Sequence, residues 1–227
     1  MEHVLKAIFP QFAKYDFTHQ DLAGLIMERF RDEPRKINNP REVRHFLNRL
    51  NNGMEAGGTP GQVSYAYGGW MEDRRQMFPG TRVEQKPYHL GVDITLNADI
   101  KVHSPVDCIV AATQAHKYDS VGWGTRLILK PVRNNGLFLF FGNLSPELNV
   151  GLDNIIPAGA PIGKIGRHSD NGGVFSHLHI QSVTIDEVMR IGDESLHFDC
   201  YAENDSESTR RSYPEPLAEI AKLMRKQ

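Results

Sequence analysis

The chain has 227 residues and a formal net charge of −2, with 26 basic and 28 acidic side chains. This length allows a sizeable core and one or two domains, and the near-balanced charge gives no reason to expect nucleic acid or an anionic membrane as a partner. No apolar run approaches the length of about 18 residues that indicates a transmembrane helix. The first residues lack a basic region followed by an apolar stretch, so the sequence as given predicts a cytoplasmic protein.

Residues 1–52 are expected to be helical and to pack as an appendage on the rest of the chain. Thr18, with the acidic Asp21 three residues later, is typical of a helix N-terminus, and Asn39 followed by Pro40 is typical of a second one. Each start is followed by an apolar stripe at helical spacing, which indicates core or docking surface and not a ligand site. The stripes are Leu22, Leu25, Ile26 and Phe30, and then Val43, Phe46, Leu47 and Leu50.

Residues 53–87 are expected to be a loop or linker that leads into the core, because their first part is rich in glycine and short polar residues. This first part ends in Tyr65, Tyr67 and Gly68-Gly69-Trp70. These residues either belong to an ordered surface loop with some aromatics packed down or form part of the rim of a substrate groove. The sequence leaves both interpretations open.

Residues 88–183 alternate short β-rich runs with glycine, proline and asparagine turns. No helical stripe of useful length interrupts them, which predicts an antiparallel β core. One hairpin is expected from residues 127–132 to residues 137–141, around Asn134-Asn135-Gly136. Cys108 fits a buried apolar position in this pattern, and a disulfide with Cys200 is the alternative.

Residues 184–227 are expected to be irregular and charged as far as Arg211, and then to close the fold with a helix between Pro214 and Lys226. The apolar residues that share one side of this helix are Leu217, Ile220, Ala221 and Met224. The fold class is therefore mainly β, α+β overall, with an N-terminal helical appendage and a C-terminal helix.

Two separated histidine motifs indicate a metal site. Residues two apart in a strand point the same way with Cα atoms about 6.6 Å apart, so His177 and His179 are expected to face one site from a single strand. A straight strand would place His89 and Asp93 about 13 Å apart, and we therefore expect a bend at Gly91. Two imidazoles and a carboxylate supply three protein ligands to zinc, and an open fourth position for water is typical of a catalytic site.

Several segments between these motifs follow one another in the order of a known family pattern. They are Val102–Val110, Gly122–Leu129, Phe141–Ser145, Ile156–Gly166 and Phe175–His179. From about Tyr88 to Ser182 the chain resembles the lysostaphin-type zinc metallopeptidases, which cut peptide bonds in bacterial cell-wall peptidoglycan. The resemblance implies an antiparallel β sandwich of the duplicated hybrid motif type, with a metal groove on one sheet.

Carried over residue by residue, the resemblance implies that His89, Asp93 and His179 hold one Zn²⁺ ion. His177 is then the general base, and Asn143 stands where the family has a further histidine. An asparagine amide can donate a hydrogen bond to an oxyanion but cannot carry a proton, and loss of one oxyanion donor typically costs a factor of about 10²–10³ in rate. The resemblance therefore implies a metallo-endopeptidase with weakened activity. None of the other histidines is expected to be a ligand.

The leading hypothesis is a zinc-dependent endopeptidase that uses a metal-activated water on peptidoglycan cross-bridges or related peptides. Members of this family usually work outside the cytoplasm, whereas the sequence as given shows no export signal. The alternative is a catalytically weakened or inactive regulator that binds metal or peptide, which Asn143 favours. A phosphocarrier of the sugar-uptake system also uses paired histidines, but it is a more distant alternative because it does not explain Asp93.

Overall fold

The computed structural model describes residues 1–52, 63–77, 81–114, 124–133, 136–171, 173–191 and 199–225. Its helices are α1 (Glu2–Ile8), α2 (Leu22–Arg29), α3 (Pro40–Asn51), α4 (Ile185–Ile191), α5 (Glu207–Ser212) and α6 (Pro216–Met224), with 3₁₀ turns at η1 (Pro10–Phe12), η2 (Pro34–Asn38) and η3 (Arg82–Glu84). Its strands are β1 (Asp16–His19), β2 (Ser64–Gly68), β3 (Tyr88–His89), β4 (Gly91–Ile94), β5 (Lys101–His103), β6 (Cys108–Gln114), β7 (Thr125–Pro131), β8 (Leu137–Leu144), β9 (Ile155–Ile156), β10 (Pro161–Lys164), β11 (Leu178–Thr184) and β12 (Tyr201–Ala202).

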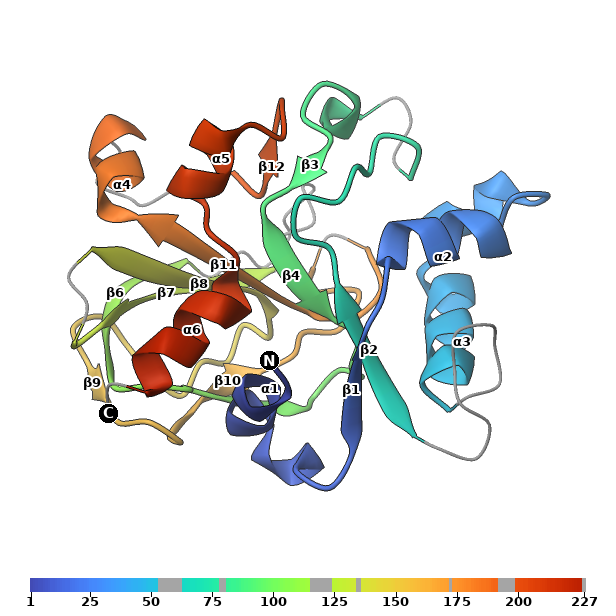
Figure 1. Ribbon diagram of the computed structural model, residues 1–227. Helices are drawn as coiled ribbons and strands as arrows, with labels where there is room; N and C mark the ends of the chain where they lie inside the picture. Colours follow the sequence, from blue (N-terminus) through green and yellow to red (C-terminus); the bar gives the residue numbers. More distant parts are fainter. Residues whose placement is uncertain are drawn as a thin grey trace.

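A large mixed sheet forms the centre of the fold (Figure 1). Its strands follow the order β1-β2-β4-β11-β8-β7-β6-β9. Neighbouring strands are antiparallel, except that β1 pairs with β2 in parallel. Two small sheets, β5 with β10 and β3 with β12, lie apart from it. The expectation of a mainly β, α+β fold is therefore confirmed, whereas the large sheet is mixed and not purely antiparallel.

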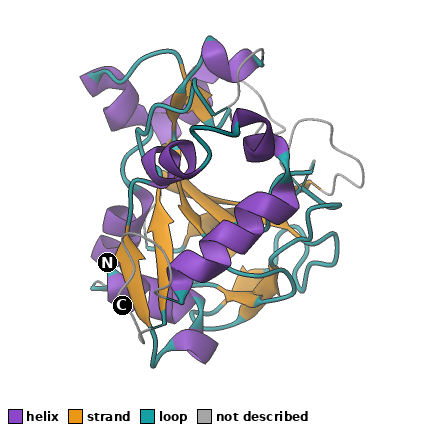
Figure 2. Ribbon diagram, turned by 90° about the vertical axis from the view of Figure 1, so that its right-hand side faces the viewer, coloured by secondary structure: helices purple, strands orange, loops and turns teal. Residues whose placement is uncertain are grey.

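Both faces of the large sheet are covered, as strand β8 illustrates. All eight of its residues are buried. Leu139 and Phe141 belong to one core cluster, and Phe138 and Phe140 belong to another, as the alternation of side chains along a strand requires. Helices α1 and α6 pack against each other over the first cluster (Figure 1). Figure 2 shows the central strands surrounded by helices.

The N-terminal segment is part of the core and not an appendage. Its strand β1 extends the large sheet, with Asp16 opposite Ser64 and His19 opposite Tyr67, and the buried side of α1 belongs to the first core cluster. Residues 1–52 are therefore not helical throughout, and the loop expected for residues 53–87 contains strand β2. In β1 the backbone N–H and C=O groups form hydrogen bonds with the neighbouring strand β2. In a helix they would form hydrogen bonds within the same segment.

Helix α2 begins at Asp21 and not at Thr18, where the sequence places it. The Asp21 side chain accepts a hydrogen bond from the amide of Gly24 at 2.8 Å, whereas Thr18 lies in β1. Helix α3 begins as predicted, because Asn39 accepts hydrogen bonds from two amides of the first turn at 3.1 and 3.4 Å. The apolar stripes of the two helices pack together in a third cluster, which confirms their expected role as core.

The expected hairpin is present as the antiparallel pair β7 and β8, and its Asn134 and Asn135 lie outside the described residues. The closing helix is α6, but α4 and α5 also form in the segment that the sequence predicts to be irregular. Cys108 and Cys200 are both buried free thiols, so Cys108 takes the expected apolar position and the disulfide alternative is not formed. Among the described residues, no helix has the length and apolar character needed to cross a bilayer.

Candidate metal centre

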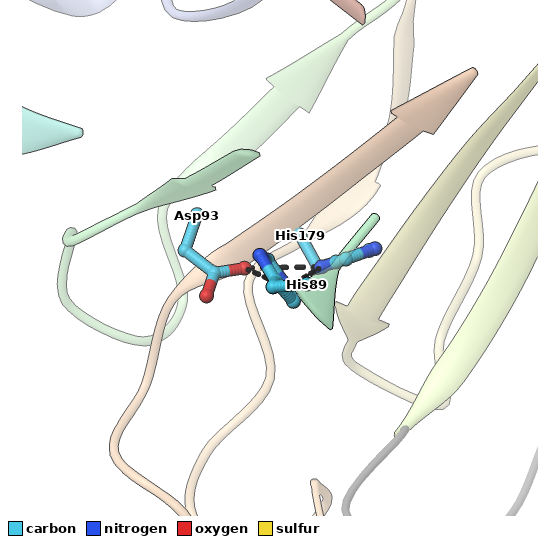
Figure 3. A group of neighbouring side chains, drawn as sticks. All are labelled: His89, Asp93 and His179. Carbon is cyan, nitrogen blue, oxygen red and sulfur yellow. Dashed lines mark hydrogen bonds and ion pairs between the residues drawn. The ribbon is translucent and has the colours of Figure 1, made fainter. Parts of the chain in front are cut away.

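Three strands build the candidate site. Strand β3 carries His89, β4 carries Asp93 and β11 carries His179. Asp93 and His179 are direct partners in the antiparallel β4–β11 pair. At Leu90 the chain passes from the small sheet, where β3 pairs with β12, to the large sheet, where β4 pairs with β11. Figure 3 shows the three side chains pointing toward one another.

The three potential ligand atoms form a compact triangle. His89 Nε2 lies 3.0 Å from His179 Nδ1, which lies 3.0 Å from Asp93 Oδ1. The third side, from His89 Nε2 to Asp93 Oδ1, measures 3.6 Å. A tetrahedral zinc ion with bonds of about 2.0–2.1 Å separates its ligand atoms by about 3.3–3.4 Å. The three residues therefore fit such an ion in spacing and in donor type. In the described part of the chain they form the cluster of histidine and acidic side chains that could hold a metal ion.

Hydrogen bonds on the outer side of each ring determine which nitrogen faces the centre. His89 Nδ1 lies 3.0 Å from the carbonyl oxygen of Gly69. Because a carbonyl only accepts, Nδ1 donates and Nε2 keeps its lone pair. His179 Nε2 lies 3.2 Å from the acceptor Gln181 Oε1, so Nε2 carries a proton. Nδ1 faces the centre, where it would present its lone pair to a bound metal. Outer partners of this kind are typical of metal-binding histidines.

Arg74 places a buried positive charge beside the site. Its Nη1 donates to Asp93 Oδ2 at 2.7 Å, and its Nε donates to Glu72 Oε2 at 3.0 Å. Burial alone would raise the pKa of Asp93, but His89 and Arg74 lower it well below its ordinary range. Burial lowers the pKa of His89 well below its ordinary value, and Arg74 lowers it further. The site thus holds a carboxylate and a neutral imidazole, the protonation states that metal binding requires.

His177 and Asn143 lie next to the three potential ligands. His177 Nδ1 donates to the carbonyl oxygen of Phe175 at 2.8 Å, which leaves a lone pair on Nε2, 3.7 Å from Asp93 Oδ1. Asn143 Nδ2 lies 2.6 Å from this Nε2. Asn143 Oδ1 is a buried acceptor with no hydrogen-bond partner among the described residues, so it can accept from a water or a substrate N–H.

His177 faces the same site as His179, as the H-x-H spacing predicts, but it does so from just before the strand and not from within it. It precedes β11, which begins at Leu178, so the alternation of a single strand does not place it. The ring is nevertheless buried at the site, and burial lowers the pKa of its imidazole. A neutral imidazole with a lone pair on Nε2 is the form that accepts a proton.

Sequence reasoning missed two residues that shape the site, Arg74 and Gln181, and it gave Gly69 only as part of a possible groove rim. Gln181 follows His179 by two positions in a strand, and the same alternation that links such residues could have identified it. Gly69 and Arg74 lie in the stretch that the sequence predicts to be a loop, and no motif or spacing connects them to the histidines.

The remaining histidines are not brought to the site. His3, His19, His45 and His168 are exposed. His103 Nδ1 lies 3.3 Å from the carbonyl oxygen of Ile8, in α1. His116 and His197, together with Gly122 and Trp123 of the family-like segment, lie outside the described residues.

Neither a protein-family model nor a characterised protein sequence matches the chain. Several solved structures are similar in fold. Lysostaphin in solution is 18% identical, and the match covers 78% of this chain and 54% of that chain with a TM-score of 0.46. The catalytic domain of lysostaphin from Staphylococcus simulans is 19% identical, with 60% and 80% covered and a TM-score of 0.40.

A zinc-containing peptidase from Vibrio cholerae is also similar, at 21% identity over 43% of this chain and a TM-score of 0.36. The chain spans 28% of the length of that peptidase and 54% of the lysostaphin chain. The function of this chain is therefore inferred from the geometry of its own site.

Proposed function

We propose that the protein is a zinc-dependent endopeptidase that hydrolyses peptide bonds in peptidoglycan cross-bridges or related peptides. The observation that carries this proposal is the triangle of His89, Asp93 and His179. Its ligand atoms lie 3.0 to 3.6 Å apart, with one nitrogen of each imidazole turned inward. Three protein ligands leave a coordination position for water, as in catalytic zinc sites.

When bound in such a site, zinc lowers the pKa of a water ligand to about 7 and polarises a carbonyl oxygen. The surrounding residues supply the proton transfer. His177 Nε2 carries its lone pair beside the ligand triangle, where it can accept a proton and then deliver it to the leaving amine. Asn143 Nδ2, once released from His177, can donate a hydrogen bond to the oxyanion.

Zinc-dependent cleavage of defined peptides tests the proposal. The protein, loaded with one equivalent of zinc, is incubated with glycine-rich and cross-bridge peptides, and the products are measured by mass spectrometry. We expect slow cleavage that needs zinc and that His177→Ala lowers by about 10²-fold or more. His168→Ala, a change at an exposed histidine, should leave the rate unchanged. Absence of cleavage by the zinc-loaded protein, or cleavage that His177→Ala does not alter, contradicts the proposal.

A second candidate function is a metal- or peptide-binding regulator without turnover. The observation that favours it is the 2.6 Å contact between Asn143 Nδ2 and His177 Nε2, because an amide hydrogen on this nitrogen occupies the lone pair that a general base needs. Stoichiometric zinc binding without cleavage of any peptide, and without cleavage by Asn143→His, is the result expected for a regulator. Cleavage that appears or increases in Asn143→His favours the peptidase.

A further inference from the structure

Arg74 is a buried cation that the proposed reaction does not use. Its side chain is 7% exposed. Its Nη1 donates at 2.7 Å to Asp93 Oδ2, whereas the other oxygen, Oδ1, lies beside the two imidazoles. The backbone at Gly69 closes directly over the guanidinium, since a Cβ there would overlap Arg74 Nη2 and lie 2.9 Å from His89 Nδ1. The side chain is therefore held in one place.

We propose that Arg74 is the resident cation of the metal-free site. It balances the charge of Asp93 when no metal is bound, through Oδ2, the carboxylate oxygen that is not part of the ligand triangle. A buried carboxylate without a cation is unfavourable, and Arg74 Nη1 contacts Asp93 at 2.7 Å from a side chain that is itself buried, so Arg74 supplies a positive charge that stabilises the ligand set before metal arrives. This inference rests on the proposed zinc site and adds a charge-balancing residue beside it.

Glu72 completes the charge balance around Arg74. Its side chain is 12% exposed, and its Oε2 accepts from Arg74 Nε at 3.0 Å. It also accepts a hydrogen bond from the backbone of Ala23 and contacts the side chain of Asp21, at the start of α2. A continuous series of contacts therefore runs from α2 through Glu72 and Arg74 to Asp93. The N-terminal segment supports the outer wall of the metal centre through these contacts.

The two charges beside Asp93 should affect zinc binding in opposite directions. A zinc ion takes over the balancing of Asp93 and is repelled by Arg74, and charge interactions in a protein interior are stronger than in water. Loss of the Arg74 charge should therefore strengthen zinc binding. Loss of the Glu72 charge should weaken it, because the repulsion from Arg74 is then no longer compensated. A merely structural ion pair predicts weaker binding in both cases.

The test compares Arg74→Met, Arg74→Lys and Glu72→Gln with wild type. Arg75→Met is the matched control, because Arg75 is the next residue but is 53% exposed and pairs with Asp73. Zinc affinity is measured by competition with a chromophoric chelator. Melting temperature is measured in excess chelator and again in saturating zinc.

We expect metal-free Arg74→Met to melt about 10 °C below wild type and zinc to restore more than half of the difference. Its Kd for zinc should fall about 10-fold, because the repulsion between Arg74 and the ion is gone, and that of Glu72→Gln should rise about 10-fold. Arg74→Lys keeps the charge, so its Kd should stay within about 3-fold of wild type. Arg75→Met should behave as wild type throughout.

The proposal is overturned if Arg74→Met and Glu72→Gln both weaken zinc binding, or if Arg74→Met loses as much stability with zinc as without it. If Arg74→Met does not fold, the Kd values of the other two variants test the proposal. Arg74→Lys should then stay within about 3-fold of wild type while Glu72→Gln binds zinc about 10-fold more weakly, and any other result overturns the proposal. If wild type binds no zinc, the proposed function fails, and melting in chelator still tests Arg74. In that case the proposal is supported if Arg74→Lys melts close to wild type and Arg74→Met melts well below it. Equal melting temperatures for the two variants overturn it.

Discussion

Gly91 lies directly against the imidazole of His179. A Cβ at position 91 would overlap Cε1 of that ring and would lie 2.6 Å from both its Nε2 and the carbonyl oxygen of Ile180. The spacing of the motif predicts a bend at Gly91, whereas the structure places Gly91 in β4, opposite Gln181. The break between β3 and β4 falls at Leu90. The missing side chain of Gly91 makes the space in which His179 turns toward Asp93.

Gly91→Ala should displace the His179 ring and weaken zinc binding by about 10- to 100-fold, the range found when the support of a ligand is lost. Overpacking of this kind also costs about 1–3 kcal/mol of folding free energy. Zinc affinity by chelator competition and stability by urea unfolding measure the two effects. Gly151→Ala is the control, because its nearest neighbour is Asn154 Oδ1 at 3.9 Å. Unchanged zinc affinity in Gly91→Ala would show that His179 does not need this space.

Gln181 orients His179 from the side away from the centre. Its Oε1 accepts from His179 Nε2 at 3.2 Å, and its Nε2 donates to the carbonyl oxygen of Asp199 at 3.1 Å, so the amide is itself held in place. Gln181→Ala should weaken zinc binding by about 10- to 100-fold, measured by chelator competition. Gln11→Ala, which removes one exposed hydrogen bond to Lys101, should leave the affinity unchanged. Equal affinities for the two variants would argue against the role of Gln181.

The sequence identifies the candidate ligands but not the groups that orient them. His89, Asp93 and His179 stand in short motifs of residue types that bind metals, and their partners follow from strand pairing, which brings β4 and β11 side by side. Arg74 carries no such signal, because its contact with Asp93 depends on how residues 69–77 pack over the site. A side chain that acts through space from an irregular segment has no periodicity to reveal it.

For the fold, too, the sequence predicts elements that depend on neighbouring residues and misses elements that depend on pairing with distant segments. The apolar stripes of α2 and α3 are read correctly, since a helix is determined by residues three and four apart. Strands β1 and β2 are missed because each pairs with a segment far away in sequence. Their propensity alone is a weak guide, because packing and pairing decide whether a short run becomes a strand.

Asn51, the last residue of α3, connects this helix to the backbone of residues 66 and 95 by side-chain hydrogen bonds. Its Nδ2 donates to the carbonyl oxygen of Thr95 at 3.0 Å, and its Oδ1 accepts from the amide of Ala66 at 2.9 Å. Asn51→Leu leaves two buried backbone groups without partners, each of which costs about 1–3 kcal/mol. We expect the free energy of unfolding in urea to fall by about 2–4 kcal/mol.

The matched control for this variant is Asn52→Ala, at the exposed neighbouring position. A surface change of this kind usually alters stability by no more than about 0.5 kcal/mol. If Asn51→Leu were as stable as Asn52→Ala, the N-terminal segment would have to be attached to the core by other contacts, such as the pairing of β1 with β2.

The metal-free protein should lose stability as the pH falls below about 6.5. Burial lowers the pKa of His89 and of His177 in the folded state, while in the unfolded chain histidine keeps a value near 6.5. The unfolded state then binds more protons, so stability is complete above about pH 6.5 and declines below it. Asp93, whose folded pKa is lowered, loses its contribution only below about pH 4.

Melting temperatures in excess chelator between pH 5 and pH 8 measure this dependence. We expect a plateau above pH 7 and a steady decline from pH 6.5 to pH 5, and we expect His177→Gln to flatten part of the decline because one of the two buried imidazoles is gone. His168→Gln, at an exposed position, is the matched control and should keep the wild-type slope. A melting temperature that is constant across this range would mean that the two buried imidazoles take up protons in the folded protein as readily as in the unfolded chain, and it would contradict the lowered pKa of His89 and His177.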